Sequence, residues 1–152
     1  SYSLYRDRLE DWYKANVDPK WTEQTKEISR VLQAEAELDE IVKLVGVDAL
    51  SPEDRLTLEV ARSIREDFLQ QDAFNPDDAY CSLQKQFDMV SLIFYFRAQA
   101  LEALKKGADI EKIATLESRE QIGRAKNVPE AEYRATFAEI RNQIDRELAA
   151  LV

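Results

Sequence analysis

Residues 82–106 read SLQKQFDMVSLIFYFRAQALEALKK, a long and largely apolar run that contains neither glycine nor proline. Apolar side chains fall on nearly every side of the helix that this run would form, which is typical of a helix surrounded by other helices. Gly107 follows directly and is expected to end the helix. The run therefore predicts the central helix of a helical domain.

Several further helices are predicted around this central one. Apolar residues recur at intervals of three and four, breakers separate the segments, and no strand-like alternation extends beyond a few residues. Trp12 and Trp21 bracket the first loop and are expected to anchor its packing. We expect an all-α bundle of about five to seven helices in which residues 1–152 form one domain. The expected ranges are about 3–15, 22–45, 51–71 and 109–127 (one or two short helices), with a last helix opened by Pro129.

Composition excludes several classes of function. The net charge is −9 and the pI is about 4.7, which argues against general nucleic-acid binding because the phosphate backbone attracts basic surfaces. No apolar run approaches the roughly 18 residues that span a bilayer, so no direct membrane insertion is expected. The chain begins with Ser1 rather than Met, and we expect it to be part of a longer protein.

Catalysis within these residues is not expected. The chain has no histidine and a single cysteine, Cys81, which excludes Ser-His-Asp and Cys-His catalysis and makes a metal site improbable. Its three glycines are scattered and form no phosphate-binding loop. We therefore predict no catalytic residue, no metal ligand and no cofactor in the chain itself.

Residues 48–54 (DALSPED) predict a strongly capped helix start. Ser51 is expected to accept a hydrogen bond from the amide of Asp54, and the Asp54 carboxylate to return one. Pro52 suits the first helical position, and acids there favour the positive end of the helix dipole. Helix capping by itself therefore accounts for the residue types in this segment. The functional alternative is that a helix–turn–helix tip presents Asp48, Glu53 and Asp54 to a basic surface.

Phe74 and Tyr80 flank the next loop. Phe74 precedes Asn75, the expected cap of the following helix, but the position that would pack against its ring is Ala79, which is small. Two aromatic rings on either side of a loop suit an apolar slot for a flat heterocycle.

These segments together resemble the C-terminal helical domain of the catalytic A subunit of archaeal and vacuolar-type (V/A-type) rotary ATPases. The resemblance is carried by residues 40–54 (EIVKLVGVDALSPED), by the run 56–74, by 72–81, and by Ser1 to Tyr5 with Trp12 and Tyr13. It covers essentially the whole chain.

The resemblance implies two sites. Residues 48–54 are similar to the Asp-Glu-Leu-Ser-Glu-Glu-Asp loop of the beta subunit of F-type ATP synthase, which touches the rotating central stalk. Two acids of that loop are replaced here by Ala49 and Pro52, so the local charge is lower. Phe74 and Tyr80 match two aromatics that line the adenine pocket of that subunit, at the same spacing. The implied central-stalk contact comprises Asp48, Ala49, Leu50, Ser51, Pro52, Glu53 and Asp54.

The family also implies what surrounds this domain. An N-terminal β-barrel and a nucleotide-binding domain, which holds ATP or ADP with Mg²⁺, would lie outside this sequence, and the fragment alone would hydrolyse nothing. The implied partners are the central-stalk rotor subunit, together with neighbouring B subunits of a cytoplasmic assembly peripheral to the membrane. That assembly couples ATP hydrolysis or synthesis to rotation and to proton or sodium transport. The alternative from the residues alone is a free-standing acidic helical adaptor that binds a basic protein.

Overall fold

The computed structural model describes residues 2–69 and 81–152, and within these ranges it contains helices and turns but no strand. The prediction of an all-α bundle is confirmed. The elements are α1 (Tyr2–Asn16), α2 (Trp21–Val45), a 3₁₀ turn (Val47–Ala49), α3 (Pro52–Ser63), a π-helical segment (Ile64–Leu69), α5 (Leu83–Lys105), α6 (Ile110–Ala114), α7 (Glu117–Gly123), a second 3₁₀ turn (Ala125–Asn127) and α8 (Tyr133–Ala149).

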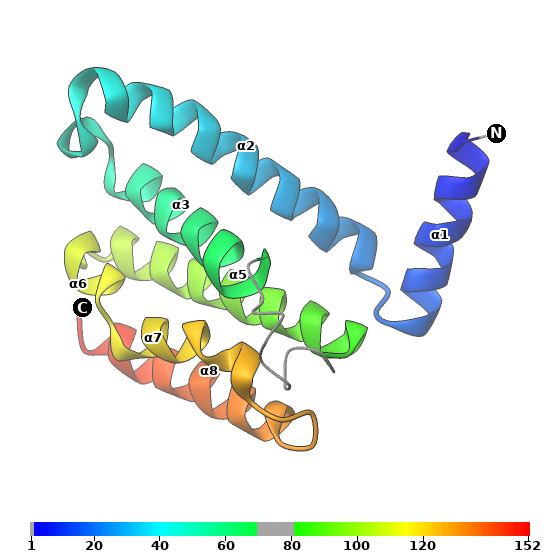
Figure 1. Cartoon of the computed structure of the whole chain (residues 1–152). Coiled ribbons are helices and arrows are strands. Elements are labelled where there is room, and N and C mark those ends of the chain that lie inside the picture. The colour runs from blue at the N-terminus through cyan, green and yellow to red at the C-terminus, as the bar shows by residue number, and fades with distance from the viewer. Residues whose placement is uncertain (1, 70–80) are drawn as a thin grey trace.

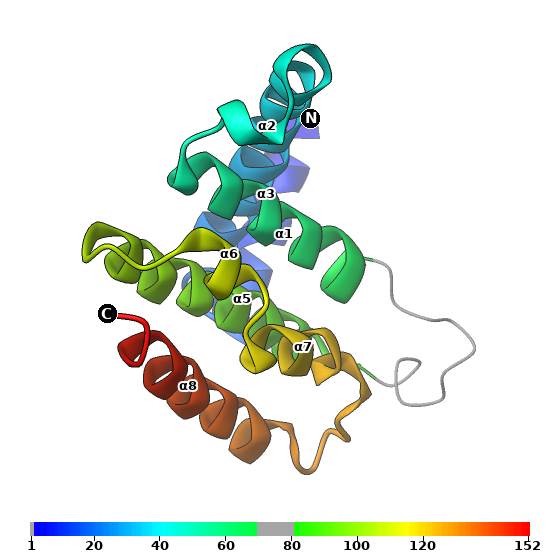
Figure 2. The same cartoon turned by 90° about the vertical axis from the view of Figure 1, so that its left-hand side faces the viewer.

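Four long helices form a stack in the order α2, α3, α5, α8 (Figures 1 and 2). The short helices α6 and α7 lead from α5 to α8, and they pack against α3 and α8 respectively. Helix α1 projects at one end of the stack, where it contacts α2 (Figure 1). The turn between α2 and α3 lies at the opposite end of α2 from α1 (Figure 1). None of the helices in the described residues is long and apolar enough to cross a membrane.

The central helix is α5, as the sequence predicts. Its core positions are completely or almost completely buried, and they pack against residues of α3 and α8. Leu56 and Val60 of α3, and Ile64 directly after it, have at most 1% of their surface exposed. The buried residues of α5 are Lys85, Phe87, Met89, Val90, Leu92, Ile93, Phe96, Ala100 and Ala103.

The aromatic residues around the first loop differ in their burial. Trp21 stacks on Tyr13 with ring centroids 4.4 Å apart and lies 6.3 Å from the ring of Phe87 on α5. Trp12 makes an edge contact with Tyr13 but leaves half of its own surface exposed. The prediction of a packing anchor is confirmed for Trp21 and wrong for Trp12.

The last helix begins later than predicted. Pro129 lies in a turn closed by a hydrogen bond from the Glu132 amide to its carbonyl, and α8 starts at Tyr133. Just before this turn, the buried ammonium of Lys85 donates to the carbonyls of Lys126 (2.9 Å) and Val128 (2.6 Å). These hydrogen bonds attach the segment before Pro129 to α5. The sequence of this segment does not reveal them, because the donor lies on a different helix.

Candidate functional site

The turn between α2 and α3, which we call the tip (residues 46–54), has a tightly determined backbone. Gly46 ends α2 with a φ of 86°, a left-handed value that a side chain would strain, and its amide donates to the Val42 carbonyl at 2.9 Å. The 3₁₀ turn follows, with a bond from the Leu50 amide to the Val47 carbonyl at 3.1 Å. The tip therefore has a defined shape.

The predicted helix cap is formed in part. The Ser51 hydroxyl accepts from the Asp54 amide at 3.1 Å, and Pro52 occupies the first helical position. Within the described residues the structure shows no return bond from the Ser51 amide to the Asp54 carboxylate. Ser51 thus performs the capping role that the sequence predicts, but the predicted reciprocal bond to Asp54 is not formed.

The structure brings the predicted stalk-contact residues together but does not expose all of them. Asp48, Ala49, Ser51, Pro52 and Glu53 are exposed, Asp54 is half-buried, and Leu50 is buried with 9% of its surface accessible. Leu50 therefore anchors the tip to the domain and offers little surface to a partner.

The helix that leaves the tip does not remain an α-helix to its end. The sequence predicts a helix to about Gln71, yet residues Ile64–Leu69 adopt π-helical geometry. Segments of this kind are rare and occur often at functional sites. From Pro52 to Leu69 the backbone spans roughly 25 Å. We call this continuous element the strut (residues 52–69). Phe74 and Tyr80, the predicted adenine contacts, lie outside the described residues.

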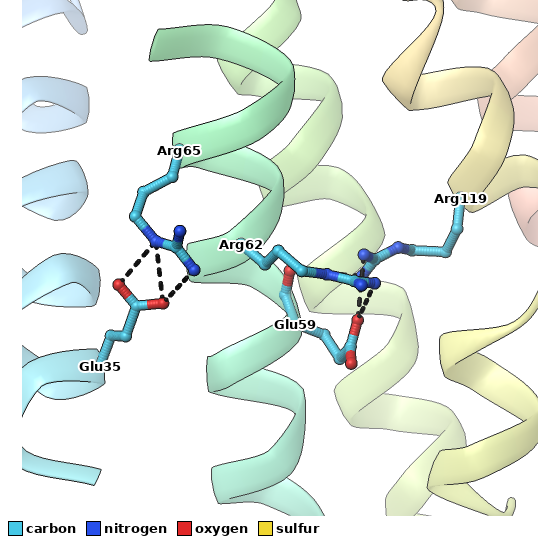
Figure 3. Close-up of polar contacts among 5 residues, drawn as sticks. All are labelled: Glu35, Glu59, Arg62, Arg65 and Arg119. Atoms are coloured by element: carbon cyan, nitrogen blue, oxygen red, sulfur yellow. Dashed lines mark hydrogen bonds and ion pairs between the residues drawn. The ribbon is translucent and has the colours of Figure 1, made fainter. Parts of the chain in front are cut away.

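An ion pair attaches the strut to α2. The Arg65 guanidinium donates to both carboxylate oxygens of Glu35, from Nε at 2.9 and 3.1 Å and from Nη2 at 2.8 Å (Figure 3). These hydrogen bonds raise the pKa of Arg65 above its ordinary value, against the opposing effect of burial. A guanidinium and a carboxylate that meet along two edges fix orientation as well as distance.

A second set of contacts attaches the strut to α7. Glu59 accepts from Arg62 at 2.7 Å on its own helix and pairs with Arg119 of α7 at 3.1 Å (Figure 3). The side chain of Arg119 is only 8% exposed, and burial lowers its pKa in spite of Glu59. One further nitrogen, Nε of Arg119, is buried and has no hydrogen-bond partner among residues 2–69 and 81–152. Glu59 is therefore the counter-charge that makes this buried guanidinium tolerable.

The π-helical segment also lies close to α7. Burial raises the pKa of the Asp67 carboxyl above its ordinary value. A Cβ placed on Gly123 would lie 3.3 Å from Oδ1 of Asp67, so this glycine permits the close approach. The strut is thus held on one side by α2 and on another by α7.

Sequence patterns do not reveal these contacts. Glu35, Glu59, Arg65 and Arg119 carry no distinguishing signal, because a chain with 30 acidic residues offers many equivalent pairings. A local signal exists only for Glu59 and Arg62, which are three residues apart on one helix. The described residues contain no group of acidic or cysteine side chains arranged to hold a metal ion.

Comparison with known proteins identifies a family. Residues 10–114 match the family model for the C-terminal domain of V- and A-type ATP synthases. All 152 residues align with the V-type ATP synthase alpha chain of Acetivibrio thermocellus at 48% identity and with that of Thermoanaerobacter pseudethanolicus at 49%. The A subunit of the A-type ATP synthase of Staphylothermus marinus is 46% identical over the same length. The chain spans only 26% of the length of each of these curated relatives.

Proposed function

The chain belongs to the family of C-terminal domains of V- and A-type ATP synthases, and from that premise we propose that it transmits nucleotide-driven movement of a catalytic A subunit to a rotating central stalk. The tip contacts the stalk, and the opposite end of the strut receives the movement. The free-standing adaptor is not favoured, since the whole chain matches part of an ATP synthase subunit.

The rigidity of the strut supports this proposal. Its core face has at most 1% exposure at Leu56, Val60 and Ile64, and protein cores resist deformation because they are close-packed. Its outer sides are attached to α2 through Glu35 and to α7 through Arg119. A displacement at Leu69 therefore moves the tip with the rest of the bundle rather than being absorbed by bending.

The remainder of the assembly supplies the chemistry in this proposal. ATP or ADP with Mg²⁺ binds elsewhere in the subunit, with Phe74 and Tyr80 against the adenine. Neighbouring B subunits surround the domain, and the assembly is peripheral to the membrane on the cytoplasmic side. It links ATP hydrolysis or synthesis to proton or sodium transport. The isolated domain performs no catalysis.

The transmission role is tested in the assembled ATPase. Within the complete catalytic chain, the exposed residues 47–49 are replaced by a glycine–serine segment of equal length, which keeps Leu50 and Ser51, and ions transported per ATP hydrolysed are measured in vesicles. The proposal expects ATP hydrolysis to persist while transport per ATP falls. Unchanged transport per ATP would overturn it. Because surface loops tolerate such exchanges better than core segments do, the altered subunit should still assemble.

Two measurements on the 152-residue chain test whether it acts on ATP by itself: a nucleotide titration followed by NMR for binding, and an assay of released phosphate for hydrolysis. Adenine stacking contributes only about 1–3 kcal/mol per base, and the phosphate contacts lie elsewhere in the proposal. We expect weak binding of ATP or none, and no release of phosphate. Micromolar affinity would contradict this expectation.

A further inference from the structure

Four aliphatic side chains gather on the surface at the end of α2 and the start of the tip. Leu44 is 84% exposed, Val45 64%, Ile41 45% and Val47 42%. Leu44 is the most exposed large apolar side chain in residues 4–69 and 81–152. We call these four residues the aliphatic patch.

The patch lies beyond the last buried residue of α2, which is Leu38. Ile41, Leu44 and Val45 are related by spacings of three and four, so they share one face of α2. Leu38, one turn earlier, has only 9% of its surface exposed, whereas all four residues of the patch are exposed. The space beside Gly46 is also unoccupied, because a Cβ built there would meet no atom within 4 Å. A contiguous exposed apolar surface commonly marks an interaction site.

Acidic residues lie beside the patch. Asp48 and Glu53 are exposed, and neither forms an ion pair within the part of the chain that the structure describes. The nearby cations are engaged, since Lys43 pairs with Glu40 at 3.4 Å and Arg55 pairs with Glu111 at 3.2 Å. The surface therefore combines an apolar centre with a negative edge.

We propose that the aliphatic patch, rather than the acidic residues of the tip, makes the main contact with the rotating stalk at this end of the domain. Its occupant is an aliphatic ridge on the rotor subunit, flanked by lysine or arginine side chains that face Asp48 and Glu53. This inference rests on the proposed function and specifies the chemistry of the same contact.

The physical properties of the two kinds of contact favour this assignment. Hydrophobic contact is non-directional and scales with the area removed from water, so it persists while one surface slides over another. Exposed ion pairs add little affinity and are screened by salt, although they steer the approach of the partner. The tip also carries fewer acids than the related loop, with Ala49 and Pro52 in place of two of them.

The experiment compares two double variants in the full assembly. One carries Leu44→Gln and Val45→Thr, which removes apolar surface, and the other carries Asp48→Asn and Glu53→Gln, which removes charge at constant shape. Val152→Thr is the matched control, because Val152 is also exposed, at 57%, but lies at the far end of the chain. The measurement is the Kd of the purified rotor subunit for the complex of A and B subunits, at low and at high salt.

We expect the apolar double variant to weaken binding about tenfold or more, the acidic one by about threefold or less, and the control not at all. The acidic variant should change mainly the association rate and its salt dependence. An equal or larger loss in the acidic variant overturns the inference but leaves the stalk contact in place. If neither double variant changes the Kd, the inference and the stalk contact of the proposed function are both overturned.

Discussion

Arg65 holds the carboxylate of Glu35 through three hydrogen bonds, across the boundary between α2 and the π-helical end of the strut. The Glu35 side chain is 12% exposed and that of Arg65 is 43% exposed, so the pair is partly screened by water. Its main effect is to fix the position of the strut relative to α2.

Glu35→Gln is expected to lower the free energy of unfolding by about 1 kcal/mol, because a charge-assisted, two-edged contact becomes a weaker neutral one. Urea denaturation measures the change. The control is Glu37→Gln, an exposed acid on the same helix, which should have little effect. Equal losses for the two variants would show that the contact with Arg65 contributes nothing specific.

The buried pair of Glu59 and Arg119 should be strongly coupled. Glu59→Gln leaves the Arg119 guanidinium, 8% exposed, without its counter-charge, and we expect a loss of about 2 kcal/mol. Replacing both residues, with Arg119→Met as the second change, should cost less than the sum of the single variants, since the buried guanidinium is then removed together with the carboxylate that it pairs with. A double-mutant cycle in urea measures this coupling. Additive losses would contradict it.

Glu27 should give the chain a measurable sensitivity to acid. A hydrogen bond from Arg30, and then contacts with Arg97, lower the pKa of Glu27 below its ordinary value, while burial opposes them. A lowered folded-state pKa contributes stability that is present above the unfolded pKa and is lost as pH falls through the folded value. The loss therefore falls below about pH 4.5, the region where unfolded glutamates titrate.

Glu27→Gln should accordingly be less stable than the unmodified chain at neutral pH and approach it in stability at about pH 3. Urea denaturation at several pH values measures the difference. Glu23→Gln alters an exposed acid on the same helix and serves as the control. A difference for Glu27→Gln that stays constant from neutral to acid pH would be incompatible with this linkage.

Ser51→Ala should destabilise the tip. The hydroxyl caps α3 through the Asp54 amide at 3.1 Å, and removal of such a cap typically costs about 1 kcal/mol. Hydrogen exchange should show faster exchange at Asp54, whose amide loses its acceptor. Ser29→Ala, at an exposed position inside α2, provides the control and should be neutral or slightly stabilising. Unchanged exchange at Asp54 would argue against the capping role.

The central helix and the capped tip could be predicted because both depend on local rules. The run from 82 to 106 is apolar on nearly every side, and the pattern of Ser51 and Pro52 is that of a helix start. The late start of α8 and the exposure of Trp12 could not be predicted, because each depends on which distant residues come close. Beside the first of these, Lys85 donates to carbonyls more than forty residues away.

Residue type and spacing along single segments were enough to establish the helical class, the helix end marked by Gly107, and the resemblance to a rotary ATPase domain. Contacts between helices had to be seen before Leu50 could be recognised as buried and Leu44 as exposed, and before Glu35 and Arg119 could be identified as holding the strut from two sides. The physical reason is that burial and ion pairing depend on which segments meet in space. In a chain where acids and aliphatic residues are abundant, spacing alone does not select among the many partners available.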